Sequence, residues 1–151
     1  MNSTATNAGG WKSSEMNSFL NSTFYNGLPN DLKSVIVACT KYTDNVGGTG
    51  DSSTTNLATN VTATSQAIWL MTQMEIEGKV GSRMNPGEKD KQAQYDYYAS
   101  GNTLGKGTYW TRSPLAYNSS ATDSFFVATT TDTNGAKATV EYQIFPCFCI
   151  G

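Results

Sequence analysis

Two carboxylates, Glu75 and Glu77, are separated by one residue. On a β-strand their side chains would share a face and could hold a cation or act as an acid and base pair. On a helical turn they diverge, and Glu75 then caps the helix or pairs with Arg112. The helical interpretation is favoured, because residues 73–78 ("QMEIEG") have the character of one helical turn that closes at Gly78.

The sequence offers few residues for other catalytic mechanisms. It contains no histidine, which removes the Ser-His-Asp and Cys-His mechanisms and the common histidine-based metal sites. Asp123 and Asp132 are further carboxylates, but nothing in their spacing implies that they meet. We therefore expect no catalytic residue, no metal site and no cofactor.

The three cysteines are Cys39, Cys147 and Cys149. Their odd number and the lack of a CxxC pair argue against a disulfide framework and against a structural zinc site. We interpret all three as buried thiols. On a strand, Cys147 and Cys149 would point to the same face.

The composition is poor in charge and rich in neutral polar residues. Charged residues make up 15% of the 151 residues, whereas the chain contains 21 Thr, 15 Ser and 13 Asn; soluble domains typically carry about a quarter charged residues. This composition suits an extracellular or virion module rich in β-structure better than a cytosolic enzyme.

Net charge and hydropathy exclude two kinds of partner. A formal net charge of −2 with scattered Lys and Arg gives no electrostatic footprint for nucleic acid or an anionic membrane. The longest strictly apolar runs, at residues 35–39 and 67–71, are far short of the roughly 20 residues that span a bilayer. We expect neither nucleic-acid binding nor membrane insertion.

The order of elements predicts one α+β domain over residues 9–151, after a flexible segment at residues 1–8. Ser13 is a possible N-cap of a first helix that stops at Gly27, and Pro29 opens a second short helix. The other predicted elements are strands at 34–43 and 63–72, a surface loop at 43–62, a loop at 79–87, a short helix at 88–100 with Tyr95 and Tyr98 on one face, strands at 108–113, 124–130, 136–142 and 144–150, and a hairpin turn at 132–135 ("DTNG"). Helices followed by strands predict helices packed on an antiparallel sheet.

The strand "TYWTRS" alternates two sets of side chains. Trp110 and Arg112 share one face, and Tyr109 and Thr111 lie on the other. We interpret Trp110 as a core residue and Arg112 as the partner of a buried carboxylate or carbonyl, with Glu75 the named candidate. The alternative is that Arg112 contacts a ligand.

A polar tract follows this strand at residues 115–124 and is either a solvated loop or a recognition surface. Recognition surfaces favour Tyr with Ser and Asn, because Tyr brings a large rigid contact area and the small polar residues adapt their hydrogen bonds. The candidate ligand-binding residues are Tyr109, Thr111, Tyr117, Asn118, Ser119, Ser120, Thr122, Asp123, Asp132 and Asn134.

Four segments in the same order resemble a family of uncharacterised domains of gut Firmicutes and their phages. Its pattern runs from "GGWxxSxMRxWLN" through "DKxFLLSxxE" and "WWLRSP" to "GVRPAFCI". The corresponding segments here are "GGWKSSEMNSFLN" (9–21), which includes Trp11, "SQAIWLMTQME" (65–75), "YWTRSP" (109–114) and "QIFPCFCI" (143–150). The chain departs from the pattern at Thr111, Gln143, Phe145 and Cys147.

That family in turn resembles the C-type-lectin-like fold of formylglycine-generating-enzyme relatives. The resemblance implies a terminal strand that pairs near the start of the domain, helices that flank the sheet, and late irregular segments on one exposed face. Trp11, Glu75, Trp110 and Arg112 would then be structural. The calcium-lectin motifs "EPN" and "WND" are missing, and Cys147 and Cys149 do not convincingly match the copper-binding cysteines of the enzymes.

Three functional hypotheses follow from these patterns. The leading one is a non-catalytic recognition or display domain of a phage virion or bacterial surface protein, which binds a host-surface glycan or protein through the late polar loops. The second is a decoration or tail protein that contacts neighbouring subunits, with homo-oligomers expected. The third, less favoured, is a formylglycine-generating-type enzyme with a metal site at Cys147 and Cys149.

Overall fold

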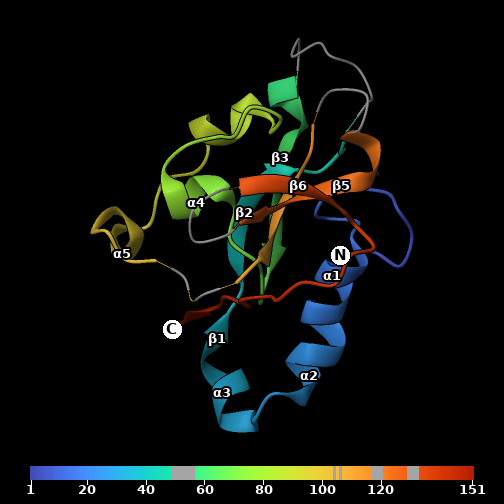
Figure 1. Ribbon diagram of the computed structural model, residues 1–151. Coiled ribbons are helices and arrows are strands. Elements are labelled where there is room, and N and C mark those ends of the chain that lie inside the picture. The colour runs from blue at the N-terminus through green and yellow to red at the C-terminus, as the bar shows by residue number, and fades with distance from the viewer. Residues whose placement is uncertain (49–56, 104, 106, 117–120, 129–132) are drawn as a thin grey trace.

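The computed structural model describes residues 1–48, 57–103, 105, 107–116, 121–128 and 133–151. It combines short helices with small antiparallel sheets, which confirms the expected mixed α+β class (Figure 1). The helices are α1 (Glu15–Phe19), α2 (Tyr25–Gly27), α3 (Asn30–Val35), α4 (Gln73–Glu77) and α5 (Asp96–Ala99), with a π-helical turn η1 (Leu20–Phe24) and 3-10 turns η2 (Leu57–Asn60), η3 (Pro86–Asp90) and η4 (Ala121–Asp123). The strands are β1 (Ile36–Val37), β2 (Cys39–Asp44), β3 (Val61–Gln66), β4 (Tyr109–Pro114), β5 (Ser124–Ala128), β6 (Thr133–Lys137) and β7 (Cys149–Ile150).

The described strands form three antiparallel sheets. β1 pairs with β7, β2 pairs with β3, and β5 lies between β4 and β6. Figure 1 shows α1, α2 and α3 in the lower half of the view, β5 and β6 crossing above them, and α5 at the left edge. The pairing of β7 with β1 brings the C-terminal segment beside residues near the start of the domain.

Aromatic and aliphatic side chains from the N-terminal segment, from the residues after β3 and from β4 meet in one core. Trp11 and Leu20 come from the N-terminal segment, Ile68 and Leu70 follow β3, and Trp110 comes from β4. The Trp11 Nε1 atom donates a hydrogen bond to Gln66 Oε1 over 2.9 Å, so this large side chain is buried with its polar atom paired. Trp11 and Trp110, for which the sequence predicts structural roles, are both core residues.

Two residues of segment 1–8, which the sequence predicts to be flexible, are buried in the fold. Met1 packs into the main core. The side-chain amide of Asn7 is fully buried, and its Nδ2 atom donates to the carbonyls of Leu115 at 3.0 Å and Ser124 at 2.7 Å. Polar sequence suggested mobility, but these long-range hydrogen bonds satisfy the polar groups inside the fold.

Backbone conformation and close packing explain the two glycines of the "GGW" segment. Gly9 and Gly10 have φ angles of 78° and 56°, in the left-handed region that favours glycine. A Cβ atom on Gly10 would lie 2.0 Å from the carbonyl oxygen of Asp44. The close approach places Trp11 beside the end of β2, where its backbone N–H donates to the same carbonyl at 3.4 Å.

The helix boundaries follow the sequence signals with two departures. The N-cap of α1 is Ser14, whose hydroxyl accepts from Asn17 N, rather than Ser13. The stop at Gly27 and the start after Pro29 are confirmed by the ends of α2 and α3. The predicted helix at 88–100 is instead split into η3 and α5 by irregular backbone.

Several predicted strands are shorter than expected. β2 is separated from β1, and β3 ends at Gln66, after which residues 67–72 are irregular apart from a single bridge. Only Cys149–Ile150 of the predicted strand at 144–150 is strand, and residues 138–142 of the predicted strand at 136–142 lie outside β6. β-branched composition predicted extended backbone, but pairing partners exist over only part of each segment.

The hairpin predicted from "DTNG" exists between β5 and β6, with a different turn position. Asn134 pairs with Val127 and Gly135 with Phe126, so both residues belong to β6. The connecting residues 129–132 lie outside the described part of the chain. Glycine at position 135 allows the Leu115 side chain to pack closely against β6, because a Cβ atom there would lie only 2.8 Å from that side chain.

Candidate functional site

A buried ion pair joins β4 to α4. Arg112 Nη1 lies 2.6 Å from Glu75 Oε2, and Arg112 Nη2 lies 2.9 Å from Glu75 Oε1. Arg112 also donates to the carbonyls of Leu70 at 2.5 Å and Tyr42 at 3.2 Å. The prediction that Arg112 pairs with Glu75 is confirmed.

Glu75 is positioned by the helix that it caps. The Thr72 hydroxyl accepts from Glu75 N, and Glu75 Oε2 accepts from Thr72 N, so the two residues form a capping box. Gly78 ends α4 with φ at 69°, as the sequence predicts. Glu77 pairs with Lys79 at 3.2 Å, so the two carboxylates diverge on the helical turn, as the sequence predicts.

Lys41 on β2 brings a second cation to the same carboxylate. Its Nζ lies 3.8 Å from Glu75 Oε1 and donates a 2.8 Å hydrogen bond to the Tyr95 hydroxyl. The Tyr95 hydroxyl in turn donates to Glu75 Oε1 at 2.9 Å. Lys41 Nζ also lies 4.3 Å from the centroid of the Trp69 ring, within cation–π range.

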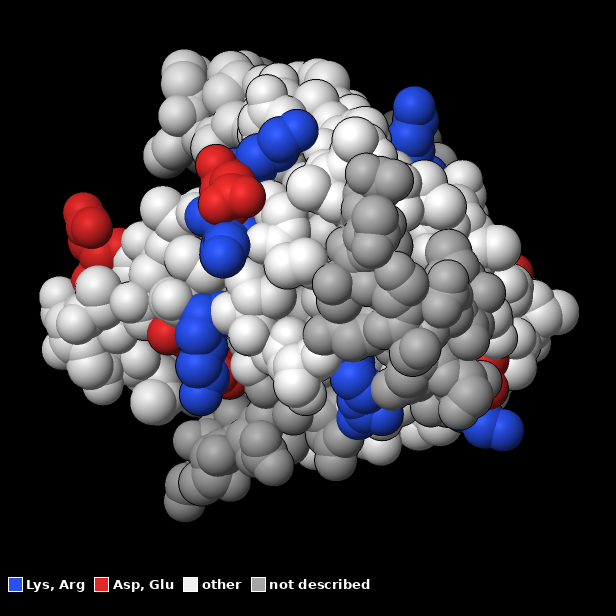
Figure 2. Space-filling model, turned by 90° about the horizontal axis from the view of Figure 1, so that it is seen from above, with Lys and Arg blue, Asp and Glu red and all other residues white. Residues whose placement is uncertain are grey.

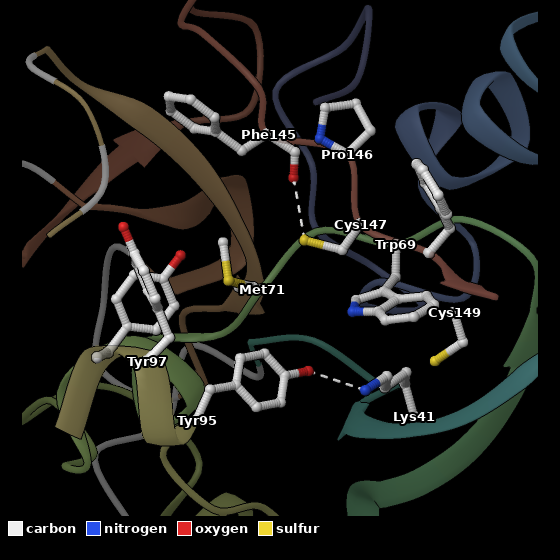
Figure 3. Close-up of a pocket in the computed structure, with 11 residues that line it drawn as sticks. Lys41, Trp69, Met71, Tyr95, Tyr97, Phe145, Pro146, Cys147 and Cys149 are labelled. Carbon is white, nitrogen blue, oxygen red and sulfur yellow. Dashed lines mark hydrogen bonds between the residues drawn. The ribbon is translucent and has the colours of Figure 1, made fainter. Parts of the chain in front are cut away.

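A pocket of about 570 Å³ opens beside Lys41 (Figure 3). Its volume falls in the range of roughly 300–1,000 Å³ that is usual for small-molecule sites. Aromatic and other apolar side chains form most of its wall. The lining residues are Lys41, Trp69, Met71, Tyr95, Tyr97, Tyr98, Phe145, Pro146, Cys147, Phe148 and Cys149.

Three segments that are distant in sequence hold this wall together. Trp69 and Cys147 exchange two backbone hydrogen bonds, of 3.0 and 2.8 Å, which fix the C-terminal segment beside residues 67–72. The Tyr95 N–H donates to the Glu75 carbonyl at 3.0 Å and places the start of α5 against α4. Phe145 packs edge-on against Tyr109, with ring centroids 5.1 Å apart.

Burial and neighbouring charges shift the pKa values of four groups in or beside the pocket. Burial favours a raised pKa for Glu75, but the charge of Arg112 and its hydrogen bonds outweigh burial and hold the pKa below its usual value. Burial, with the neighbouring Glu75 charge, raises the pKa of Tyr95. Burial raises the pKa of Cys147 to about 11 and that of Tyr98 to about 12.

Another buried carboxylate, that of Glu88, contacts Ser113, the residue next to Arg112. Glu88 is fully buried and accepts hydrogen bonds from the Thr43 hydroxyl, the Asp44 N–H and the Ser113 hydroxyl, over 2.9 to 3.2 Å. Burial raises the pKa of Glu88, and these hydrogen bonds offset that only in part. It ties β2, η3 and β4 together.

Two of the predicted ligand-binding residues are corrected by their burial. Tyr109 and Thr111 are both buried, and the Thr111 hydroxyl donates to the Phe126 carbonyl at 3.0 Å. Every residue of β4 is buried, so the side chains on both faces of the strand are covered. Neither side chain therefore lies on an exposed recognition face.

The other predicted ligand-binding residues are scattered between described and undescribed parts of the chain. Tyr117, Asn118, Ser119, Ser120 and Asp132 lie outside the described residues. Thr122 is exposed, and Asp123 accepts from the Ser124 hydroxyl at 2.7 Å and lies 3.9 Å from Lys137 Nζ. Asn134 belongs to β6. The role of the polar tract in binding stays a prediction.

Sequence reasoning missed the aromatic pocket. One signal was present in "QYDYYAS", which places three tyrosines within four residues. A second was Phe145, an exposed-type position in the resembled pattern that carries an aromatic residue in this chain. The three cysteines are free thiols and only partly buried, and Cys147 and Cys149 line this pocket.

Charged side chains on the face seen in Figure 2 are interspersed, with Lys and Arg beside Asp and Glu over its described part. Among the described residues, no group of three or more His, Cys, Asp or Glu side chains could hold a metal ion. No helix in the described part of the chain is long and apolar enough to cross a membrane.

The family described as Domain of unknown function (DUF6273) matches residues 1–151, and the chain belongs to it. This confirms that the chain is a member of an uncharacterised domain family. No curated protein and no solved structure matches the chain.

Proposed function

We propose that this chain is a non-catalytic recognition domain with a C-type-lectin-like fold, carried by a phage virion or a bacterial surface protein. The observation that carries the proposal is the aromatic pocket, in which Tyr97 is 61% and Phe148 is 40% exposed. Exposed aromatic side chains around a concave site are typical of binding surfaces. The ligand is a glycan or protein of the host surface.

The state of the ionisable groups supports binding over catalysis. A general base or nucleophile at neutral pH needs a pKa near the working pH. Here the pKa of Glu75 is lowered, whereas the pKa values of Tyr95 and Cys147 are raised. Glu75 and Tyr95 are also held by hydrogen bonds to Arg112 and Lys41.

Two features of the topology support the C-type-lectin-like fold. The terminal strand β7 pairs with β1, near the start of the domain. The helices α1 to α3 precede the sheets in the chain and lie together in the lower half of the view in Figure 1. The late polar tract would then add contacts next to a rigid framework, and display in many copies would raise avidity.

The experiment is a cell-binding assay with the chain fused to a tetramerising partner. Flow cytometry measures binding to a panel of bacterial cells for the original chain, Tyr97→Ser, Phe148→Ser and a variant with residues 117–120 replaced by Gly and Ser. The matched control is Phe19→Ser, because Phe19 is 43% exposed and lies on α1 away from the pocket. We expect the original chain to bind some of the cells. Phe148→Ser should reduce this binding several-fold, whereas Phe19→Ser should not.

Binding to no cell in the panel, or equal binding by the pocket variants and Phe19→Ser, contradicts the proposal. A loss confined to the variant at residues 117–120 assigns recognition to the polar tract instead of the pocket.

A decoration or tail protein is the second candidate, and the β1–β7 sheet favours it. Val37 and Ile150 on paired strands are 41% and 68% exposed, which leaves an apolar surface beside the C-terminal segment. Light scattering after size-exclusion chromatography tests self-association. Ile150→Ser should dissociate an oligomer, whereas Val46→Ser, at a similarly exposed valine, should not.

A further inference from the structure

The end of the pocket near Lys41 has more positive than negative charge. Arg112 and Lys41 share the single carboxylate of Glu75, at 2.6 and 3.8 Å. Two further carboxylates nearby, Glu88 and Asp44, are fully buried. Glu88 accepts its hydrogen bonds from two hydroxyl groups and a backbone N–H, and Asp44 accepts from two backbone N–H groups and a side-chain amide, so neither pairs with Lys41. Within the described residues, Lys41 is therefore incompletely neutralised.

The Lys41 ammonium also has unused hydrogen-bonding capacity. An ammonium group has three donors, and its one hydrogen bond among the described residues goes to the Tyr95 hydroxyl. Glu75 at 3.8 Å is beyond hydrogen-bonding distance. Figure 3 shows the ammonium directed at Tyr95, below the Trp69 ring, at the side of the pocket. Its side chain is 17% exposed, so an anion there would meet a largely dehydrated cation.

The remainder of the wall is suited to an apolar group. Met71, Phe145 and Pro146 lie across the pocket from Lys41 (Figure 3), and Phe148 adds an exposed ring. Such a wall offers few hydrogen bonds to a sugar ring with many hydroxyl groups. A ligand that complements both parts of the pocket has one anionic group on a hydrophobic body.

We propose that the pocket binds a hydrophobic carboxylate, whose carboxylate group contacts Lys41 and whose apolar body contacts the aromatic wall. This proposal rests on the recognition function and names its ligand chemistry. The same chemistry occurs in a free aromatic acid and in the C-terminal hydrophobic residue of a polypeptide.

Isothermal titration calorimetry with matched probes tests this. The free-acid pair is 2-naphthoate and the neutral 2-naphthamide. The peptide pair is Gly-Ser-Gly-Phe with a free carboxylate or with an amide at its C-terminus. We expect saturable binding of at least one carboxylate probe, and about tenfold or more weaker binding of its amide, as for loss of one charged hydrogen bond. The pair that binds more tightly identifies the source.

Three variants separate the contributions. Lys41→Gln should weaken binding of the carboxylate probe about tenfold or more, and Lys41→Arg should restore most of it. Phe148→Ser should weaken both members of a pair, with Phe19→Ser as the unaffected control. If Lys41→Gln does not fold, as judged by near-UV circular dichroism, the comparison of carboxylate with amide decides alone.

Equal affinity for carboxylate and amide, or no saturable binding of either carboxylate probe, overturns the proposal. Its failure is distinct from failure of the recognition function. Cell binding that depends on Phe148 without probe binding overturns the ligand class alone, and probe binding without cell binding overturns the recognition role alone.

Discussion

Glu75 and Arg112 form a two-point ion pair, in which both carboxylate oxygens accept from the guanidinium at 2.6 and 2.9 Å. The Arg112 side chain is fully buried, and Glu75 is 5% exposed. Since burial of one charge without the other is unfavourable, the pair is an all-or-none feature that holds β4 against α4.

Substitution of either partner should therefore be strongly destabilising. We expect Arg112→Met or Glu75→Gln to lower the free energy of unfolding by about 3–5 kcal/mol, the usual cost of breaking a buried pair. The double variant should lose less than the sum of the two, because neither charge is then left unpaired. Urea denaturation measures all four proteins, and strict additivity would show that the pair contributes no coupling.

Gly10 and Gly27 should respond oppositely to a methyl group. In Gly10→Ala the new Cβ would meet the Asp44 carbonyl at 2.0 Å in a left-handed backbone, and we expect a loss of about 3 kcal/mol or more. In Gly27→Ala nothing lies within 4 Å, and the helical position should be neutral or slightly stabilised. Thermal unfolding of both variants distinguishes the two, and equal melting temperatures would contradict the packing of "GGW" on β2.

The pH dependence of stability should contain opposite contributions from two glutamates. The lowered pKa of Glu75 contributes stability that is present above its unfolded pKa and is lost as the pH falls through the folded value. The raised pKa of Glu88 contributes stability that is present below its unfolded pKa and is lost as the pH rises towards the folded value.

Glu88→Gln isolates the second contribution. The unfolding free energy of the original chain relative to Glu88→Gln should fall by about 1.4 kcal/mol per pH unit above the ordinary glutamate pKa, until the folded pKa is reached. Denaturant titrations between pH 4 and pH 8 measure this difference, at roughly one-unit steps. Exposed Glu141→Gln is the control, and a difference that does not change with pH would mean that folding leaves the pKa of Glu88 unchanged.

Cys147 should be slow to alkylate in the folded protein. Because the thiolate is the reactive form and burial raises the pKa from 9.0 to about 11, iodoacetamide at pH 8 should react about a hundredfold more slowly than with the unfolded chain. Peptide mass spectrometry over time gives the rate at each cysteine. Rapid labelling of Cys147 would show that the pocket wall opens in solution.

The sequence predicted the framework better than the pocket. Trp11, Trp110 and the Glu75–Arg112 pair were found because large apolar residues and a lone arginine on a strand have few alternatives to burial and pairing. Gly78 and Pro29 marked helix ends through their own backbone restrictions.

The pocket was not predictable from local pattern. Lys41, Trp69, Tyr95 and Phe145 converge only because the Trp69–Cys147 bridge and the contact of α5 with α4 bring distant segments together. The errors at Tyr109 and Thr111 have the same origin. Strand alternation indicates which side chains share a face, but not that both faces of β4 are covered.

The buried amide of Asn7 has a consequence for how this domain can change in evolution. Its Nδ2 atom holds the carbonyls of Leu115 and Ser124, which stand on either side of residues 116–123. The two ends of that segment are thus anchored by a residue outside it. The Leu115 N–H also donates to the Ser124 carbonyl at 3.0 Å, so the amide of Asn7 and this backbone hydrogen bond close the same crossing. Loss of the Asn7 amide would leave both carbonyls without this donor. We therefore expect position 7 and the residues at the two anchors to change together and not separately.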